Sequence, residues 1–139
     1  MIDDVFCKII KGEIKAEAVY KDNDFWVIKD INPKAPIHLL IIPVKHFTSL
    51  EDFIGPVRSR ARDEVASPED RGAATSYGMA GAELLGKALL VAHKVAHQVG
   101  IAEKGYRLII NEGEHGGKLV PHLHIHLLGG KKLGPKMVK

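Results

Sequence analysis

Three histidines near the end of the chain stand at alternating positions, and this spacing tightly constrains the local structure. Residues 122–128 read H-L-H-I-H-L-L, and two glycines follow them. Because side chains alternate between the two faces of a β-strand, the imidazoles of His122, His124 and His126 are predicted to share one face, while the apolar residues between them face a core. Residues on one face recur about every 6.6 Å, twice the rise of a strand. Three groups that titrate near neutral pH on one rigid element indicate a site for metal binding or for phosphate chemistry.

The length and composition indicate a single globular domain. The chain has 139 residues, of which 45% are hydrophobic and 27% charged, and its net charge is +3. These values are typical of a protein with one core. Four of the lysines fall in residues 131–139, which are predicted to form a solvated basic tail. A surface that binds nucleic acid usually has a denser basic stripe with aromatic residues interleaved, so no specific nucleic-acid partner is expected.

The use of cysteine and the apolar runs indicate a cytoplasmic protein with no membrane partner. Cys7 is the single cysteine, so no intrachain disulfide is possible, which fits a reducing compartment. The N-terminus carries Asp3 and Asp4 and lacks the apolar core of a signal peptide. The longest apolar run, residues 37–43, is much shorter than the roughly 20 residues that a membrane span needs.

Hydrophobic periodicity predicts two helices and five strands in a single domain, residues 1–139. The predicted helices are residues 5–11 and 78–99, and the predicted strands are residues 18–21, 25–29, 37–42, 106–111 and 120–128. Residues 54–77 alternate charged and small residues with little apolar periodicity, so they are predicted to form a surface insertion. Ser67 followed by Pro68 has the form of a helix start, which predicts a brief helical turn within this insertion.

The residues alone leave three interpretations of the alternating histidines open. They could bind zinc with further ligands from His38, His46 or Asp30, they could supply a nucleophile for phosphate chemistry, or they could be surface residues of an edge strand. The adjoining loop, residues 112–118, reads E-G-E-H-G-G-K, and its glycines permit backbone conformations that turn several N–H groups toward one anion. Asn111 before the loop can donate to a phosphoryl oxygen. The loop therefore favours phosphate over metal.

Three further histidines need separate interpretation. His93 and His97 stand four residues apart on the predicted helix but lie off its leucine stripe, so both are predicted to be exposed. His38 interrupts a strand that is otherwise apolar. It becomes a site candidate only if this strand neighbours the histidine strand.

Several flanking segments match one family together with the His-x-His-x-His motif. They are the N-terminal run F-C-K-I-I-K-G-E-I, residues 30–38, residues 42–46, Gly105-Tyr106-Arg107, Asn111-Glu112-Gly113 and Gly116-Gly117. On these residues the chain resembles the histidine triad (HIT) family, and within it the Hint branch. The resemblance covers nearly the whole chain outside residues 54–77.

The resemblance implies a nucleotidyl hydrolase or transferase that acts on purine nucleoside 5′-phosphoramidates without a metal or another cofactor. His124 would be the nucleophile and would form a nucleotidyl-histidine intermediate. A neutral imidazole in this role needs one nitrogen lone pair exposed and the other N–H held by an acceptor, and the backbone carbonyl of His122 is the predicted acceptor. His122 and His126 would bind and polarise the phosphate, and His38 would complete the cluster.

The resemblance also implies how the nucleotide is held. Asn111 and the Gly117 N–H would contact the phosphate or the leaving group, and Asp30 would accept hydrogen bonds from the ribose hydroxyls. The base pocket would be lined by Phe6, Ile9, Ile14, Ile28, Ile31 and Leu40. Leu119 occupies a position where Hint proteins commonly have a serine that meets the leaving group. Asp4 stands where zinc-binding relatives have the first cysteine of a C-x-x-C pair, so no structural zinc through Cys7 and His46 is expected.

The family fold is α+β, with a five-stranded antiparallel sheet, a long helix and a short N-terminal helix. Two subunits would join their sheets into one of ten strands, with the long helices and residues 105–111 near the twofold axis, so a homodimer is expected. Two other functions stay open: a dinucleoside polyphosphate hydrolase, and a nucleotide-binding regulatory protein with weak catalysis. The first usually carries a proline after the motif, where this chain has Leu127-Leu128-Gly129-Gly130.

Overall fold

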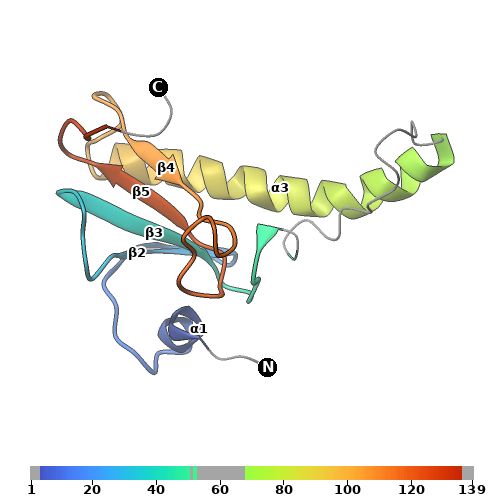
Figure 1. Ribbon diagram of the computed structural model, residues 1–139, viewed down its shortest axis with the longest axis horizontal. Coiled ribbons are helices and arrows are strands. Elements are labelled where there is room, and N and C mark those ends of the chain that lie inside the picture. Colours follow the sequence, from blue (N-terminus) through green and yellow to red (C-terminus); the bar gives the residue numbers. More distant parts are fainter. Residues whose placement is uncertain (1–3, 51, 53–67, 136–139) are drawn as a thin grey trace.

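The computed structural model describes residues 4–50, 52 and 68–135. Within these ranges the chain forms two helices and five strands (Figure 1). In chain order they are α1 (Val5–Ile10), β1 (Ala18–Lys21), β2 (Phe25–Lys29), β3 (Ile37–Pro43), α3 (Pro68–Gln98), β4 (Arg107–Ile109) and β5 (Ile125–Gly129). The α+β class, the five-stranded antiparallel sheet and both helices are therefore confirmed.

The strand order places the two histidine-bearing strands side by side. The sheet runs β1-β2-β3-β5-β4, and every neighbouring pair is antiparallel. In the ladder between β3 and β5, Leu40 lies opposite His126 and His38 lies opposite Leu128. His38 is therefore a candidate site residue, because its strand neighbours the strand that carries His126.

The sheet separates two apolar clusters, with α3 on one face and α1 on the other (Figure 1). On the α3 side, Leu123, Ile125 and Leu127 pack in the main core, as the alternating pattern predicts. On the α1 side, Phe6 and Ile9 of the helix pack with strand residues Ile28, Leu40 and Ile42. Because the residues of β5 alternate, its histidine faces the α1 side of the sheet.

Helix α1 has a cap at each end. The Asp4 side chain accepts a hydrogen bond from the Cys7 N–H at 2.8 Å, which satisfies one of the unpaired donors of the first turn. The helix ends at Ile10, one residue before the predicted end, and Gly12 follows with a φ of 82°. Asp4 and Cys7 are thus held three residues apart at the start of a helix.

Helix α3 begins earlier than the sequence predicts. It starts at Pro68, ten residues before the predicted Gly78, so the turn expected near Pro68 is part of one continuous helix that projects past the sheet (Figure 1). Residues 54–67 of the predicted insertion, and residues 136–139 of the predicted tail, lie outside the described residues. No helix in the described part of the chain combines the length and the hydropathy needed to cross a membrane.

The last two strands are shorter than predicted. Strand β4 pairs with β5 only from Arg107 to Ile109, and β5 begins at Ile125 rather than at Val120. Before β5 the backbone leaves the sheet ladder, since the Leu123 N–H donates to the Phe47 carbonyl at 2.6 Å and the His122 N–H donates to the Val120 carbonyl at 2.8 Å. Of the three alternating histidines, only His126 therefore belongs to the strand itself.

Candidate active site

The three alternating histidines gather on the α1 side of the sheet in different environments. His122 is fully buried, His124 is buried and His126 is partly exposed. The Phe6 ring lies edge-on to His122 and His124, and the His124 and His126 ring centroids are 5.0 Å apart. The shared face is confirmed, although two of the three residues precede the strand. The interpretation as surface histidines of an edge strand is wrong, because β5 is an inner strand.

The ring of His124 is oriented by the backbone two residues earlier. Its Nδ1 lies 2.7 Å from the His122 carbonyl oxygen, which can only accept, so Nδ1 carries the proton. This contact confirms the acceptor predicted from the sequence. A neutral His124 therefore has its lone pair on Nε2, which is the arrangement that an imidazole nucleophile requires.

His38 and His126 are coupled by a chain of hydrogen bonds. The Lys34 N–H donates to His38 Nδ1 at 3.0 Å, so the neutral His38 ring carries its proton on Nε2. That Nε2–H lies 2.9 Å from His126 Nδ1 and 3.3 Å from an Asp30 carboxylate oxygen. His126 Nδ1 is then an acceptor and its proton is on Nε2. The cluster thus combines a nucleophilic lone pair on one ring with an N–H donor on its neighbour.

Burial keeps these rings neutral. Loss of solvation lowers the pKa of His38, His122 and His124 below its ordinary value. The pKa of His126 falls to about 4, first because the ring is removed from water and then because charge on His124 and His38 would repel a proton on it. At neutral pH the site therefore presents imidazoles rather than imidazolium ions.

The glycine-rich loop follows β4, the strand that pairs with β5. Ile109 lies opposite His126 at the end of the β4–β5 ladder, and Asn111 follows Ile109 two residues later, where the loop begins. Gly116 is required sterically, because a Cβ there would collide with the backbone of Glu112. The Gly117 N–H donates to the Glu114 carbonyl at 3.0 Å, within the loop, rather than pointing at an open anion site.

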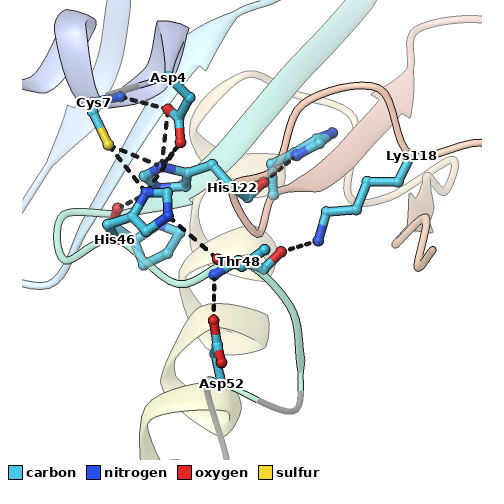
Figure 2. A network of polar contacts seen from close by, with 9 residues as sticks. Asp4, Cys7, His46, Thr48, Asp52, Lys118 and His122 are labelled. Atoms are coloured by element: carbon cyan, nitrogen blue, oxygen red, sulfur yellow. Dashed lines mark hydrogen bonds and ion pairs between the residues drawn. The ribbon is translucent and has the colours of Figure 1, made fainter. Parts of the chain in front are cut away.

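Lys118 is a site residue that the sequence analysis missed. Its side chain is only 9% exposed, and its ammonium contacts the Thr48 carbonyl (Figure 2) and, at 3.5 Å, the Glu112 carboxylate. The same carboxylate accepts from the Leu50 N–H at 3.3 Å. These contacts fasten the start and the end of the glycine-rich loop to the segment that leaves β3. The sequence offered no signal for this, since one lysine after two glycines is ordinary in a surface loop.

The structure brings together only part of the predicted base pocket. Phe6, Ile9, Ile28 and Leu40 lie in one buried cluster, whereas Ile14 is 40% and Ile31 89% exposed.

Leu119 is 92% exposed, beside a cavity of ≈ 530 Å³ whose lining includes Thr48, Gly117 and Lys118. That lining contains none of the four clustered histidines. Asp30 keeps one carboxylate oxygen on the Asn32 N–H at 2.8 Å and the other near His38.

Two sets of side chains in the described residues have the composition of a metal site. One is Asp30, His38 and His126, in which His38 Nε2 and His126 Nδ1 already hydrogen-bond to each other. The other is Asp4, Cys7, His46 and His122. His93 and His97 on α3 are exposed, as predicted, and His93 Nδ1 lies 2.8 Å from the Tyr106 hydroxyl.

Comparison with known proteins identifies the family. The model of the HIT domain matches residues 11–133 of the chain. This chain belongs to the HIT domain family. The purine nucleoside phosphoramidase of Escherichia coli (strain K12) is 41% identical to it over 133 residues, which span 96% of this chain and 92% of that protein. The family predicted from the motif and its flanks is confirmed.

Solved structures of HIT proteins share the fold. The HIT family hydrolase from Clostridium thermocellum is 40% identical and superposes with a TM-score of 0.73 over 99% of both chains. A histidine triad protein from Clostridium difficile is 33% identical, with a TM-score of 0.74 over 98% of this chain and 97% of its own. These matches cover 98–99% of this HIT chain, so the site described above lies within the shared fold.

Proposed function

We propose that this HIT protein is a nucleoside phosphoramidase, which cleaves purine nucleoside 5′-phosphoramidates through a nucleotidyl-histidine intermediate. The observation that carries this proposal is the 2.7 Å contact between His124 Nδ1 and the His122 carbonyl, because it directs the lone pair of the other nitrogen outward. The similarity to a protein named purine nucleoside phosphoramidase supports the same reaction and substrate class.

The geometry supports a reaction in two displacements. In the first, His124 Nε2 attacks the α-phosphorus and the P–N bond of the substrate breaks, so its electron pair leaves with the amine, which takes up a proton. In the second, water attacks the phosphorus, the bond to His124 breaks, and the nucleoside monophosphate is released. The His126 Nε2–H donates to a phosphoryl oxygen and stabilises the negative charge that develops there. Leu119 has no hydroxyl and is exposed, so solvent supplies the proton of the leaving amine.

The remaining predicted contacts belong to this proposal. Asn111 and the Gly117 N–H bind the phosphate after a local rearrangement of the loop, and Asp30 accepts from the ribose hydroxyls. The exposed side chain of Ile31 packs against the purine base beside Asp30. The other apolar positions, Phe6, Ile9, Ile14, Ile28 and Leu40, form the base pocket and the layer beneath it.

We further propose that the protein acts as a cytoplasmic homodimer. Strand β4 is at the edge of the sheet, and an antiparallel partner there would extend five strands to ten. Leu89 and Leu90 of α3 are 45% and 70% exposed, and a second copy would cover them. Sedimentation of the purified protein tests the dimer, and a monomer at micromolar concentration would refute it.

The reaction is tested with adenosine 5′-phosphoramidate as the substrate. The wild type is expected to release AMP, and His124→Ala is expected to lose at least about 10³-fold in kcat because no nucleophile remains. His97→Ala, which removes an exposed histidine from α3, is the matched control and should behave as the wild type. Faster hydrolysis of a diadenosine polyphosphate would identify a dinucleoside polyphosphate hydrolase instead. Binding of AMP without any turnover would identify a nucleotide-binding regulatory protein.

A further inference from the structure

Four basic side chains that the proposed reaction does not use line one cavity beyond the end of β5. The cavity has a volume of ≈ 340 Å³ and is lined by residues 104–107 and 131–133. Lys104 precedes β4, Arg107 begins that strand, and Lys131 and Lys132 follow β5. The lining contains no acidic residue.

The pairing of the last two strands brings these basic segments together. Arg107 lies opposite Leu128 in an antiparallel ladder, so the segment that enters β4 lies beside the segment that leaves β5 (Figure 1). Gly105 and Gly130 turn the chain next to these strands with φ of 106° and 89°, where a side chain would be strained. The Arg107 guanidinium donates to the Gly134 carbonyl at 3.3 Å. This hydrogen bond holds the segment that follows β5 against the start of β4.

The four cations have no acidic partner in the described part of the chain. Within residues 4–50, 52 and 68–135, no ion pair joins any of them to a carboxylate. Lys29, Lys87 and Lys118, by contrast, each lie close to a carboxylate oxygen. Positive charges that share one cavity without a counter-charge repel one another and attract anions. The cavity therefore has an unbalanced positive field.

This basic cavity is separate from the histidine cluster. Its lining contains none of the clustered histidines, and it shares no residue with the cavity beside Leu119. Ile109 and His126 mark the other end of the β4–β5 ladder, where the chain continues into the glycine-rich loop. An anion in the basic cavity would therefore contact residues other than those that bind the phosphate of the substrate.

We propose that the basic cavity binds the phosphate chain of a small oligoanion, a diphosphate or triphosphate. Arginine binds phosphate through a planar fork of N–H donors, and lysine binds it as a compact positive charge. Four positive charges balance a chain of linked phosphates, whereas a single phosphate carries at most about two negative charges near neutral pH. The volume is close to the lower limit of about 300 Å³ for small-molecule sites, which suits a compact ligand.

The surroundings favour a compact anion over a nucleic-acid strand. A strand is bound by an extended basic groove with aromatic rings on which successive bases stack. Tyr106 is the one aromatic residue in the lining, and its ring packs against the main core. Its hydroxyl lies 2.8 Å from His93 Nδ1. Tyr106 is therefore held as part of the cavity wall and is not presented as a stacking surface.

The direct test is a calorimetric titration of the protein with inorganic tripolyphosphate in buffer without divalent cations. AMP is present in excess to fill the proposed nucleotide site, so the binding that remains reports on the basic cavity. One equivalent per chain is expected, with an affinity that falls as the salt concentration rises because the contacts are ionic. Absence of tripolyphosphate binding would overturn the proposal.

Other anions define what the cavity recognises. Orthophosphate should bind at least about tenfold more weakly than tripolyphosphate, because it meets fewer of the four charges. Equal binding of the two anions would refute recognition of a phosphate chain. ATP distinguishes the two sources of such a chain: equal affinity for ATP and tripolyphosphate indicates that the chain alone is recognised, and tighter binding of ATP assigns the cavity to a nucleotide.

Variants locate the binding site on the protein. Lys131→Gln combined with Lys132→Gln should weaken tripolyphosphate binding by at least about tenfold, because two of the four charges are lost. Both side chains are exposed, so the fold should be kept, which circular dichroism checks. Lys8→Gln combined with Lys15→Gln removes two exposed charges outside the cavity and should bind as the wild type. Unchanged binding by the Lys131 and Lys132 variant would refute the site, whatever the phosphoramidase activity proves to be.

Discussion

His126 should make the folded protein sensitive to mild acid. In the folded state its pKa is about 4, whereas the ordinary value of the side chain is 6.5. Between these two values the unfolded chain binds a proton that the folded protein does not. The free energy of unfolding therefore falls as the pH is lowered from about 6.5 toward 4, and this contribution stays constant below pH 4.

The size of the effect follows from the same two values. Each tenfold change in proton affinity corresponds to about 1.36 kcal/mol, so the shift from 6.5 to about 4 sets a ceiling of about 3 kcal/mol, of which about 2 kcal/mol is lost by pH 5. The ring is partly exposed, and water screens the interaction. We therefore expect His126 to account for about 1 kcal/mol of destabilisation between pH 7.5 and pH 5.

Urea unfolding at the two pH values measures this contribution. His38, His122 and His124 also resist protonation, so the wild type alone cannot isolate one ring. The informative quantity is the difference between the wild type and His126→Gln, which should lose about 1 kcal/mol less on acidification. His97→Gln, which removes an exposed ring, should retain the wild-type loss. Equal losses in the wild type and His126→Gln would refute the assignment of a neutral His126 whose pKa is lowered by its surroundings.

The loop that follows β4 gives two further predictions. Lys118→Met should destabilise the protein by about 1–3 kcal/mol in urea unfolding, because the Thr48 carbonyl loses its donor and the Glu112 carboxylate loses its cation. Lys104→Met, at an exposed position, should change the stability little. Stability equal to the wild type would show that the Lys118 contacts are not formed in solution. Gly116→Ala should lower kcat/KM for the phosphoramidate by at least about tenfold, because the new Cβ would displace the Glu112 backbone. The control Gly134→Ala, whose Cβ would meet open space, should leave kcat/KM unchanged. Full activity of Gly116→Ala would contradict the loop geometry.

The sequence predicts best what depends on local periodicity. Leu123, Ile125 and Leu127 face the main core because alternation along the chain determines the face of each residue. The bounds of β1 and β2 are as predicted, since a turn that contains Asp22 and Asp24 separates two short apolar runs. Where the chain departs from regular geometry, the prediction fails: β5 starts five residues late because residues before it bond to the Phe47 carbonyl instead of to the sheet.

Contacts between distant segments were not predictable in the same way. The burial of Lys118 depends on a carbonyl at Thr48, and the cluster at Asp4 depends on His46 and His122, which lie far along the chain. One local signal was present, because Asp4 and Cys7 stand three residues apart across a helix start, a spacing that brings both side chains to the same end of a helix. The family resemblance connected Cys7 with His46, but without the fold nothing indicated that His122 would also meet them there.

The three alternating histidines are alike in sequence, and the backbone around them makes them chemically different. The Pro43 carbonyl places the proton of His122 on Nε2 and turns its lone pair toward Asp4. The His122 carbonyl places the proton of His124 on Nδ1, and the Lys34 N–H, acting through His38, leaves the proton of His126 on Nε2. Main-chain groups thus set the proton positions of His122 and His124 directly, and that of His126 through the His38 side chain, so these assignments depend on the fold being maintained. It follows that a substitution which shifts the backbone at Pro43 or His122 should impair the site as severely as the loss of a histidine.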